Sequence, residues 1–254
     1  MASPPRIKIE CKGINKSFMA PSGQLRVLEN VSFAIPDNEF VVLLGPGQCG
    51  KTTLLNCIGG LIAPDSGEVL LNGKPLEGPG PDRGIVFQQY ALMPWKTVEE
   101  NVAFGLAIKG IEKKERLEKA KKYISLVGLD GFEKSYPHEL SGGMRQRVGI
   151  ARAYTNDPDV LLMDEPFGAL DAQTRYAMEK ELLSIWEKDK RTVLFVTNNI
   201  EEAIYLGDRV IVMTKMPGRI KSEHPITIPK PRDYTNPDFL SWRKRISEDT
   251  ELVL

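Results

Sequence analysis

The stretch 140–171 reads LSGGMRQRVGIARAYTNDPDVLLMDEPFGALD, and it decides how the rest of the chain is interpreted. In its second half, the apolar run 160–163 is followed directly by Asp164 and Glu165. A run this short and this apolar predicts a buried parallel strand rather than a helix. Ligands of open α/β sheets bind beyond the carboxyl ends of the strands. We therefore expect the two acids to lie at a ligand site.

The first half of the same stretch opens a helix with small residues. Ser141, Gly142 and Gly143 provide a hydroxyl and two glycines ahead of a helix-forming run over 144–154. Backbone N–H groups at a glycine-opened helix N-terminus favour an anion such as phosphate. These three residues are therefore candidates for phosphate binding.

A second motif lies upstream, where residues 45–52 read GPGQCGKT and match G-x-x-x-x-G-K-[ST] in full. It follows the apolar run 40–44 and precedes a helical pattern that starts near Thr53, which is the context that a P-loop requires. In a P-loop the backbone N–H groups surround the phosphates, Lys51 reaches the β- and γ-phosphates, and the Thr52 hydroxyl binds Mg²⁺. A glycine-rich turn with a solvated lysine is the alternative, but the distant strand ending in two acids disfavours it. The expected nucleotide-binding residues of this loop are Gly45, Pro46, Gly47, Gln48, Cys49, Gly50, Lys51, Thr52 and Thr53.

With these motifs the chain resembles the ATPase subunit of an ABC (ATP-binding cassette) transporter over residues 7–242. LSGG is the most specific element, because other P-loop proteins lack it. The resemblance implies an α/β fold: a P-loop NTPase core (a mixed, mainly parallel sheet with flanking helices), an N-terminal antiparallel β subdomain and an inserted α-helical subdomain. It implies a single ABC ATPase domain over 1–254. Its parts are a RecA-like core with the β subdomain in 1–90 and 155–228, a helical subdomain with the signature in 91–154, and a C-terminal tail in 229–254.

The resemblance also assigns catalytic and metal-binding roles. It makes Glu165 the general base, with a helix-capping carboxylate as the alternative. Asp164 and Thr52 are implied in the Mg²⁺ shell together with Gln88, the lid-loop glutamine that also contacts the attacking water. A neutral amide suits that contact because it donates and accepts hydrogen bonds without titrating. Gln89 is the competing candidate for this role.

Two further residues take their expected roles from the resemblance. Phe18 stands where the family usually carries an aromatic that stacks on adenine, and a core or strand-end phenylalanine is the alternative. Asp171 ends the ALD segment of the D-loop, which crosses the dimer interface in the family.

The chain departs from the family pattern at Gln48 and Asn198. Gln48 replaces a glycine of the common P-loop, which matters only if that position needs a positive φ. Asn198 follows the expected strand 192–197 at the place of a histidine that contacts the γ-phosphate. An amide can donate a hydrogen bond to phosphate but carries no positive charge. We expect Asn198 to keep the ground-state contact and to stabilise the transition state less than histidine would.

Composition is that of a globular chain with balanced charge. Its 254 residues include 34 Lys and Arg against 34 Asp and Glu, so no basic bias points to nucleic acid. Cys11, Cys49 and Cys57 lack metal-ligand spacing and fit a reducing cytosol better than a disulfide framework. No apolar run approaches about 18 residues, and the N-terminus has no signal-peptide core. The expected location is the cytoplasmic face of the cell (inner) membrane, with peripheral attachment through other subunits.

The resemblance implies partners, because the signature of one copy completes the ATP site of a second cassette, identical or not. ATP binding closes this dimer and hydrolysis reopens it, which moves transmembrane permease subunits. Tyr90, Met93 and Trp95 are candidates for the groove that receives a permease helix, or for ordinary packing. The stretches 78–84 (GPGPDRG) and 92–106 (LMPWKTVEENVAFGL) are similar to importer ATPases for nitrate, sulfonates and taurine, which also need a substrate-binding protein.

The leading hypothesis is therefore an ATP-hydrolysing, energy-coupling subunit of an ABC importer for a small anion. A nucleotide-binding regulatory module with weak or no hydrolysis is the alternative; Asn198 and Gln48 favour it, and Glu165 disfavours it. An ABC-type ATPase of nucleic-acid repair or translation would show a coiled-coil insertion, a zinc module or a basic patch, and the sequence shows none of them.

The remaining apolar runs predict the strands around these motifs. Expected strands are 7–18 and 27–35 on either side of a turn-rich segment 19–24, then 68–71, 85–87, 209–213 and a final short strand 225–228. Asn72–Gly73 is expected to form a hairpin turn, and residues 239–246 a terminal helix.

Overall fold

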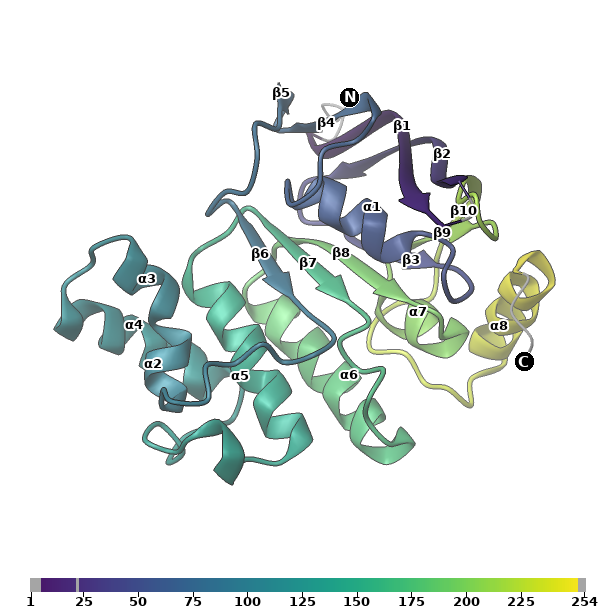
Figure 1. Ribbon diagram of the computed structural model, residues 1–254. Helices are drawn as coiled ribbons and strands as arrows, with labels where there is room; N and C mark the ends of the chain where they lie inside the picture. Colours follow the sequence, from purple (N-terminus) through teal and green to yellow (C-terminus); the bar gives the residue numbers. More distant parts are fainter. Residues whose placement is uncertain (1–5, 22, 251–254) are drawn as a thin grey trace. The chain divides into compact units, whose positions relative to one another are not determined.

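The computed structural model describes residues 6–21 and 23–250, and the chain divides into two compact units. Unit 1 comprises the described parts of 1–80 and 191–254, and unit 2 comprises 81–190. The helices and strands of both units are labelled in Figure 1. The domain boundaries expected at 90/91, 154/155 and 228/229 remain predictions.

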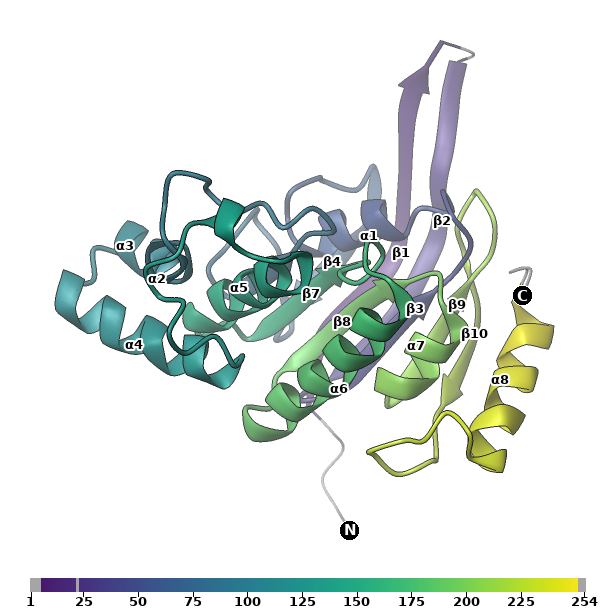
Figure 2. The ribbon, with the colours of Figure 1, turned by 90° about the horizontal axis from the view of Figure 1, so that it is seen from below.

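Unit 1 begins with an antiparallel sheet of strand order β2-β1-β4-β5. Its strands are β1 (Ile7–Ala20), β2 (Gly23–Pro36), β4 (Ser66–Leu71) and β5 (Lys74–Pro75). Asn72 and Gly73 have φ values of 52° and 76°, which a two-residue hairpin turn requires. Figure 2 shows β1 and β2 as a long hairpin. The expected N-terminal antiparallel subdomain is confirmed, although strand pairing extends into the segment 19–24 that was expected to be mostly turn.

The second sheet of unit 1 contains strands in the order β10-β9-β3-β8. Its elements are β3 (Phe40–Leu44), β8 (Thr192–Thr197), β9 (Arg209–Met213), β10 (Ile220–Pro225), and the helices α1 (Lys51–Ile58), α7 (Ile200–Leu206) and α8 (Pro237–Asp249). β3 runs parallel to β8 and β9, and every residue of β3 and β8 is buried. Strands covered on both faces need continuous apolar runs, which is why these strands were predictable.

The final strand was predicted wrongly. β10 covers Ile220–Pro225 rather than 225–228, and it pairs antiparallel with β9. Its sequence, IKSEHP, is largely polar because β10 lies at the edge of the sheet. The pairing follows a turn in which the Thr214 amide donates to the Arg219 carbonyl at 3.0 Å. The position of β10 is therefore determined by the geometry of the preceding turn and not by an alternation of apolar residues.

Unit 2 contains a pair of parallel strands and a set of helices. Its elements are β6 (Arg83–Val86), α2 (Val98–Val102), α3 (Phe104–Ile108), α4 (Lys113–Leu126), the 3-10 helix η1 (Pro137–Glu139), α5 (Gly142–Thr155), β7 (Val160–Asp164) and α6 (Ala172–Lys188). Four helices, α2 to α5, lie between β6 and β7 in the sequence, which matches the expected helical insertion. A Cβ at Gly105 would lie 2.2 Å from the Asn156 side chain, so a larger residue in α3 would displace that amide. Within the described ranges, none of the helices combines the length and the apolar character needed to cross a membrane.

Candidate functional site

The loop between β3 and α1 has the geometry of a phosphate-binding loop. Gly50 is the N-cap of α1 with φ of 100°, and a Cβ there would lie 2.8 Å from Leu28 Cδ2. Only glycine combines that backbone with that contact. Helix α1 therefore begins directly at Lys51, and its first N–H groups face the loop, where they favour an anion.

The Lys51 side chain lies within the loop that precedes it. Its ammonium donates to the carbonyl oxygens of Gly45 at 2.8 Å and Pro46 at 2.9 Å, and the residue is only 4% exposed. A buried lysine charge held by neutral carbonyls is well placed to neutralise phosphate charge. Thr52 and Thr53 follow in the first turn of α1, with Thr52 exposed.

The strained residue of this loop is Gln48. Its φ is 63°, whereas the backbone of Gly47 does not adopt a positive φ. The position where the family commonly has glycine therefore does have a left-handed backbone in this chain. A non-glycine residue in this region costs about 1–2 kcal/mol.

Asn198 lies beside the start of the same loop. Thr197 pairs with Leu44 across β8 and β3, and the Gly45 amide donates to the Thr197 carbonyl at 3.3 Å. Asn198 follows and is exposed, while Asn199 caps α7 by accepting from the amides of Glu201 at 2.8 Å and Glu202 at 3.1 Å. Of the two asparagines, Asn198 is thus the one not used as a helix cap.

Phe18 lies near the end of β1, opposite Leu25 of β2. Its side chain is 40% exposed, and the Lys16 ammonium lies 5.5 Å from its ring centroid. The ring is thus partly exposed and not part of the core, so the core alternative does not hold.

In unit 2, the turn after β7 brings the acidic pair and the lid-loop glutamine together. Asp164 ends β7 and is 9% exposed, and Glu165 has a left-handed backbone with φ of 41°. The Gly168 amide closes the turn by donating to the Glu165 carbonyl at 3.0 Å. A Cβ at Gly168 would lie 3.4 Å from Gln88 Nε2. Gln88 therefore approaches the Glu165 turn, and a non-glycine residue is held in a costly conformation at this point.

The signature segment begins α5 at Gly142, two residues before the expected start. Ser141 caps the helix by accepting from the Met144 amide at 3.3 Å. A Cβ on Gly143 would lie 3.4 Å from Thr174 Cγ2.

Asp171 lies at the start of α6, close to the same threonine. It caps α6 by accepting from the Thr174 amide at 3.0 Å and hydroxyl at 2.7 Å. These hydrogen bonds lower the pKa of Asp171. Gly143 of the predicted signature and the predicted D-loop aspartate thus both lie against Thr174.

Sequence reasoning missed two arginines of α5. Arg152 donates to the Ala91 carbonyl at 2.7 Å and to the Tyr90 carbonyl at 3.3 Å, and the Arg145 guanidinium lies 5.3 Å from the Tyr90 ring. Burial lowers the pKa of Arg152. The signature helix α5 therefore fixes the segment just after Gln88. The only feature of the sequence that could have indicated this contact is a pair of arginines seven residues apart on that helix. Tyr90 packs here, whereas Trp95 is 73% exposed.

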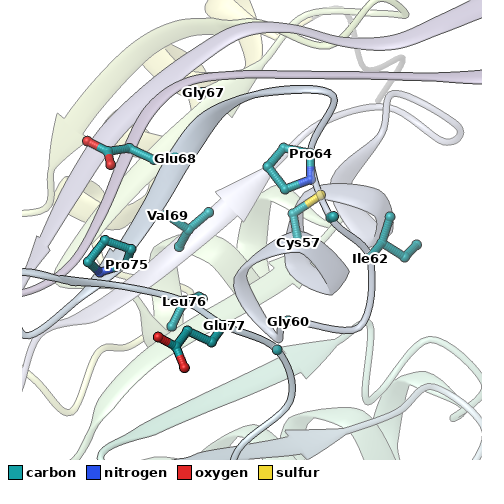
Figure 3. A pocket seen from close by; sticks show the side chains of 12 residues that line it. Cys57, Gly60, Ile62, Pro64, Gly67, Glu68, Val69, Pro75, Leu76 and Glu77 are labelled. Atoms are coloured by element: carbon teal, nitrogen blue, oxygen red, sulfur yellow. The ribbon is translucent and has the colours of Figure 1, made fainter.

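A cavity of about 400 Å³ lies at the far end of α1 (Figure 3). It is lined mainly by small and apolar residues such as Val69 and Leu76, and contains none of the predicted site residues. Burial raises the pKa of the Cys57 thiol to about 11, so this wall of the cavity offers no thiolate near neutral pH.

Comparison with known proteins gives a consistent result. A family model described as ABC transporter matches residues 28–168. An uncharacterized ABC transporter ATP-binding protein of Methanocaldococcus jannaschii is 54% identical over 95% of this chain and 90% of its own. The aliphatic sulfonates import ATP-binding protein SsuB of Bacillus cereus is 45% identical over 96% of each chain. The taurine import ATP-binding protein TauB of Rhizobium johnstonii is 53% identical over 80% of this chain and 78% of its own.

Solved structures agree with the fold. A dimeric bacterial ABC transporter cassette has a TM-score of 0.76 and 34% identity, covering 87% of this chain and 100% of its own. A dimeric ATP-binding cassette in a post-hydrolysis state, bound to ADP and Pi, has a TM-score of 0.76 and 33% identity over the same shares.

Proposed function

The chain belongs to the ABC transporter family as an ATP-hydrolysing cassette, and from this premise we propose that it couples ATP hydrolysis to import of a small anion. The proposed cargo class is nitrate, a sulfonate or taurine, supported by relatives named for sulfonate and taurine import. One observation carries the catalytic part of the proposal: Glu165 occupies a strained backbone position in the turn that Gln88 approaches. Strain of this kind persists mainly where function needs it.

The proposal assigns nucleotide binding to residues of unit 1. Amides of the loop 45–53 donate to phosphate oxygens, and the Lys51 ammonium exchanges its carbonyl partners for the β- and γ-phosphates. The exposed Phe18 ring stacks on the base. Asn198 donates a hydrogen bond to the γ-phosphate.

The donor chemistry of the assigned metal residues fits Mg²⁺. Thr52 offers a hydroxyl, Asp164 a carboxylate and Gln88 an amide oxygen, and Mg²⁺ prefers oxygen ligands. When bound, the ion neutralises charge that develops on the phosphates. We propose these three residues as its protein ligands.

The proposed hydrolytic step uses a base and an orienting amide. Glu165 accepts a proton from the attacking water, while Gln88 holds that water by donating and accepting hydrogen bonds. Asn198 carries no charge, so it contributes less to transition-state stabilisation than a histidine would.

The proposed assembly contains two cassettes and a permease. Ser141, Gly142, Gly143 and Asp171 serve the site of the second copy, and dimeric relatives support this arrangement. The exposed Trp95 is the candidate contact for the permease. We place the assembly at the cytoplasmic face of the inner membrane, with a substrate-binding protein that delivers the cargo.

The test combines turnover with uptake. Membrane vesicles carrying the chain and its permease are assayed for ATP-dependent uptake of labelled nitrate, taurine and an alkanesulfonate. We expect uptake of one of these anions, with loss of both uptake and Mg²⁺-dependent hydrolysis in Glu165→Gln. Hydrolysis without uptake of any of them would reject the anion class. ATP binding without turnover, even with the permease present, would favour the regulatory module.

A further inference from the structure

Arg232 is the most buried charged residue that the structure describes in the C-terminal tail of unit 1. This residue is 6% exposed, and its guanidinium donates to the carbonyl of Ile204, to that of Tyr205 at 3.2 Å and to that of Gly207 at 2.6 Å. These three carbonyls lie at the C-terminal end of α7, where helix carbonyls have no partner within the helix. Arg232 therefore caps α7 from a distant part of the chain, with a charge of the sign that the helix dipole favours.

The guanidinium also fixes the tail itself. Its other nitrogens donate to the Ile228 carbonyl at 3.0 Å and the Ile226 carbonyl at 3.4 Å. Beside it, the Tyr234 ring stacks on Tyr205 of α7 with ring centroids 4.8 Å apart and planes within 2°. Figure 1 shows the segment from β10 to α8 passing α7. The tail and α7 are thus joined along the C-terminal half of the helix.

The opposite end of α7 is joined to the candidate phosphate site. Asn199 caps the helix start, the Thr197 hydroxyl donates to the Glu202 carboxylate, and the Gly45 amide donates to the Thr197 carbonyl at 3.3 Å. Asn198 lies between these fixed points. Its backbone is therefore determined on one side by β8 and on the other by the placement of α7.

A seven-residue helix cannot hold its own position, because isolated helices of this length are unstable in water. Its placement depends on what contacts its ends and its buried face. Apolar packing of the tail alone would not require a buried guanidinium, whose removal from water is costly unless its donors are satisfied. Arg232 meets that condition only while the α7 carbonyls stay in place.

We propose that Arg232 is a positioning residue for the γ-phosphate contact, acting through α7 to hold Asn198 at the start of the phosphate-binding loop. The inference rests on the proposed role of Asn198. Because the proposed contact is to the γ-phosphate only, loss of Arg232 should weaken the binding of ATP and leave the binding of ADP unchanged. A residue that merely stabilised the fold would weaken both nucleotides alike.

The experiment measures ATP and ADP dissociation constants of the full-length chain by competition with a fluorescent nucleotide. All variants carry Glu165→Gln, so that ATP is not consumed. We expect Arg232→Met to weaken ATP binding about tenfold, the effect of losing one hydrogen bond to a charged group, and to leave ADP binding unchanged. Asn198→Ala should give the same selective loss, and the double variant should be no weaker than Asn198→Ala alone.

Arg219→Met is the matched control. Arg219 pairs with Glu29 of β2 at 2.6 Å and has a side chain 57% exposed, and we expect both affinities to be unchanged. If Arg232→Met yields too little folded protein, Arg232→Lys retains the charge but lacks the planar fork, so the same selective loss is expected with a smaller amplitude. Equal weakening of ATP and ADP, or additive effects in the double variant, would overturn the inference.

Failure of the proposed Asn198 contact can be distinguished from failure of the proposed role of Arg232. If Asn198→Ala leaves the ratio of ATP to ADP affinity unchanged, Asn198 makes no γ-phosphate contact and the role of Arg232 is overturned with it. Nucleotide binding by the cassette is tested separately by Lys51→Ala, which should weaken both nucleotides whatever the Arg232 variants do.

Discussion

The loops after β3 and β7 share a backbone feature and differ in the expected role of the side chain that adopts it. Each follows a five-residue strand with every residue buried, and each contains a non-glycine residue at positive φ, Gln48 at 63° and Glu165 at 41°. In the proposed site the first loop binds phosphate through backbone N–H groups and one lysine, so we expect the Gln48 side chain to be dispensable. The second loop presents the proposed base at its strained position. We therefore expect the strain to be removable in the first loop and to be required for the proposed chemistry in the second.

The difference should be largest when the side chain at each strained position is changed. Glu165→Gln keeps the size of the residue but removes its ability to accept a proton, so we expect turnover to fall about 10³-fold while ATP still binds. Phosphate release and nucleotide binding measure the two effects. Turnover within about tenfold of wild type would show that the two loops do not differ in this way.

Adding a single Cβ tests the backbone of the first loop. Gly50→Ala forces a side chain into a left-handed backbone and against Leu28, so we expect a loss of about 2–3 kcal/mol in the free energy of unfolding. Gly47→Ala is the control, because a Cβ there meets nothing within 4 Å and the φ is ordinary. Urea unfolding measures both. Equal losses would mean that the loop does not depend on the Gly50 conformation.

Asn198 allows a charged side chain to be added beside the backbone-lined loop. In the assembled transporter, Asn198→His should raise the hydrolysis rate by up to about tenfold, because an imidazolium stabilises transition-state charge. The gain should be largest near pH 6 and decrease toward pH 8, since histidine loses its charge above its pKa of about 6.5. An unchanged or lower rate at both pH values would count against the proposed contact.

The smallest expected effect comes from relieving strain where chemistry does not need it. Gln48→Gly removes about 1–2 kcal/mol of left-handed strain but makes the unfolded chain more flexible. We expect a net gain of about 0.5 kcal/mol in the free energy of unfolding, with turnover retained. Thermal and urea unfolding measure the gain, and a loss of turnover would show that Gln48 contributes through its side chain.

The strands and site residues that could be predicted from the sequence are those that a short pattern of residue types determines. Buried runs such as Phe40–Leu44 and Thr192–Thr197 require apolar residues throughout, and the glycine and lysine spacing of the P-loop is specific to phosphate binding. Motif spacing therefore located the candidate site residues along the chain. Polar edge strand β10 has no such pattern, and its position was predicted wrongly.

The parts that could not be predicted depend on contacts between distant residues. Residues 229–238 are distinguished in sequence only by proline and charge, and nothing in them points to carbonyls at the end of α7. The residue type at position 48 does not determine its left-handed backbone, because glutamine adopts that conformation only when the surrounding loop imposes it. Capping by a distant residue and backbone strain therefore produce no recognisable pattern in the sequence.

The Arg232 cap has a consequence for how this chain can evolve. All five of its described acceptors are main-chain oxygens, which every residue type provides. The side chains at 204, 205 and 207 therefore take no part in these hydrogen bonds, and what constrains them is packing: Tyr205 stacks on Tyr234, and a Cβ at Gly207 would lie 2.9 Å from the Ala203 carbonyl oxygen. Methods that infer contacts from correlated substitutions would find no signal here, even though the arginine itself should remain invariant.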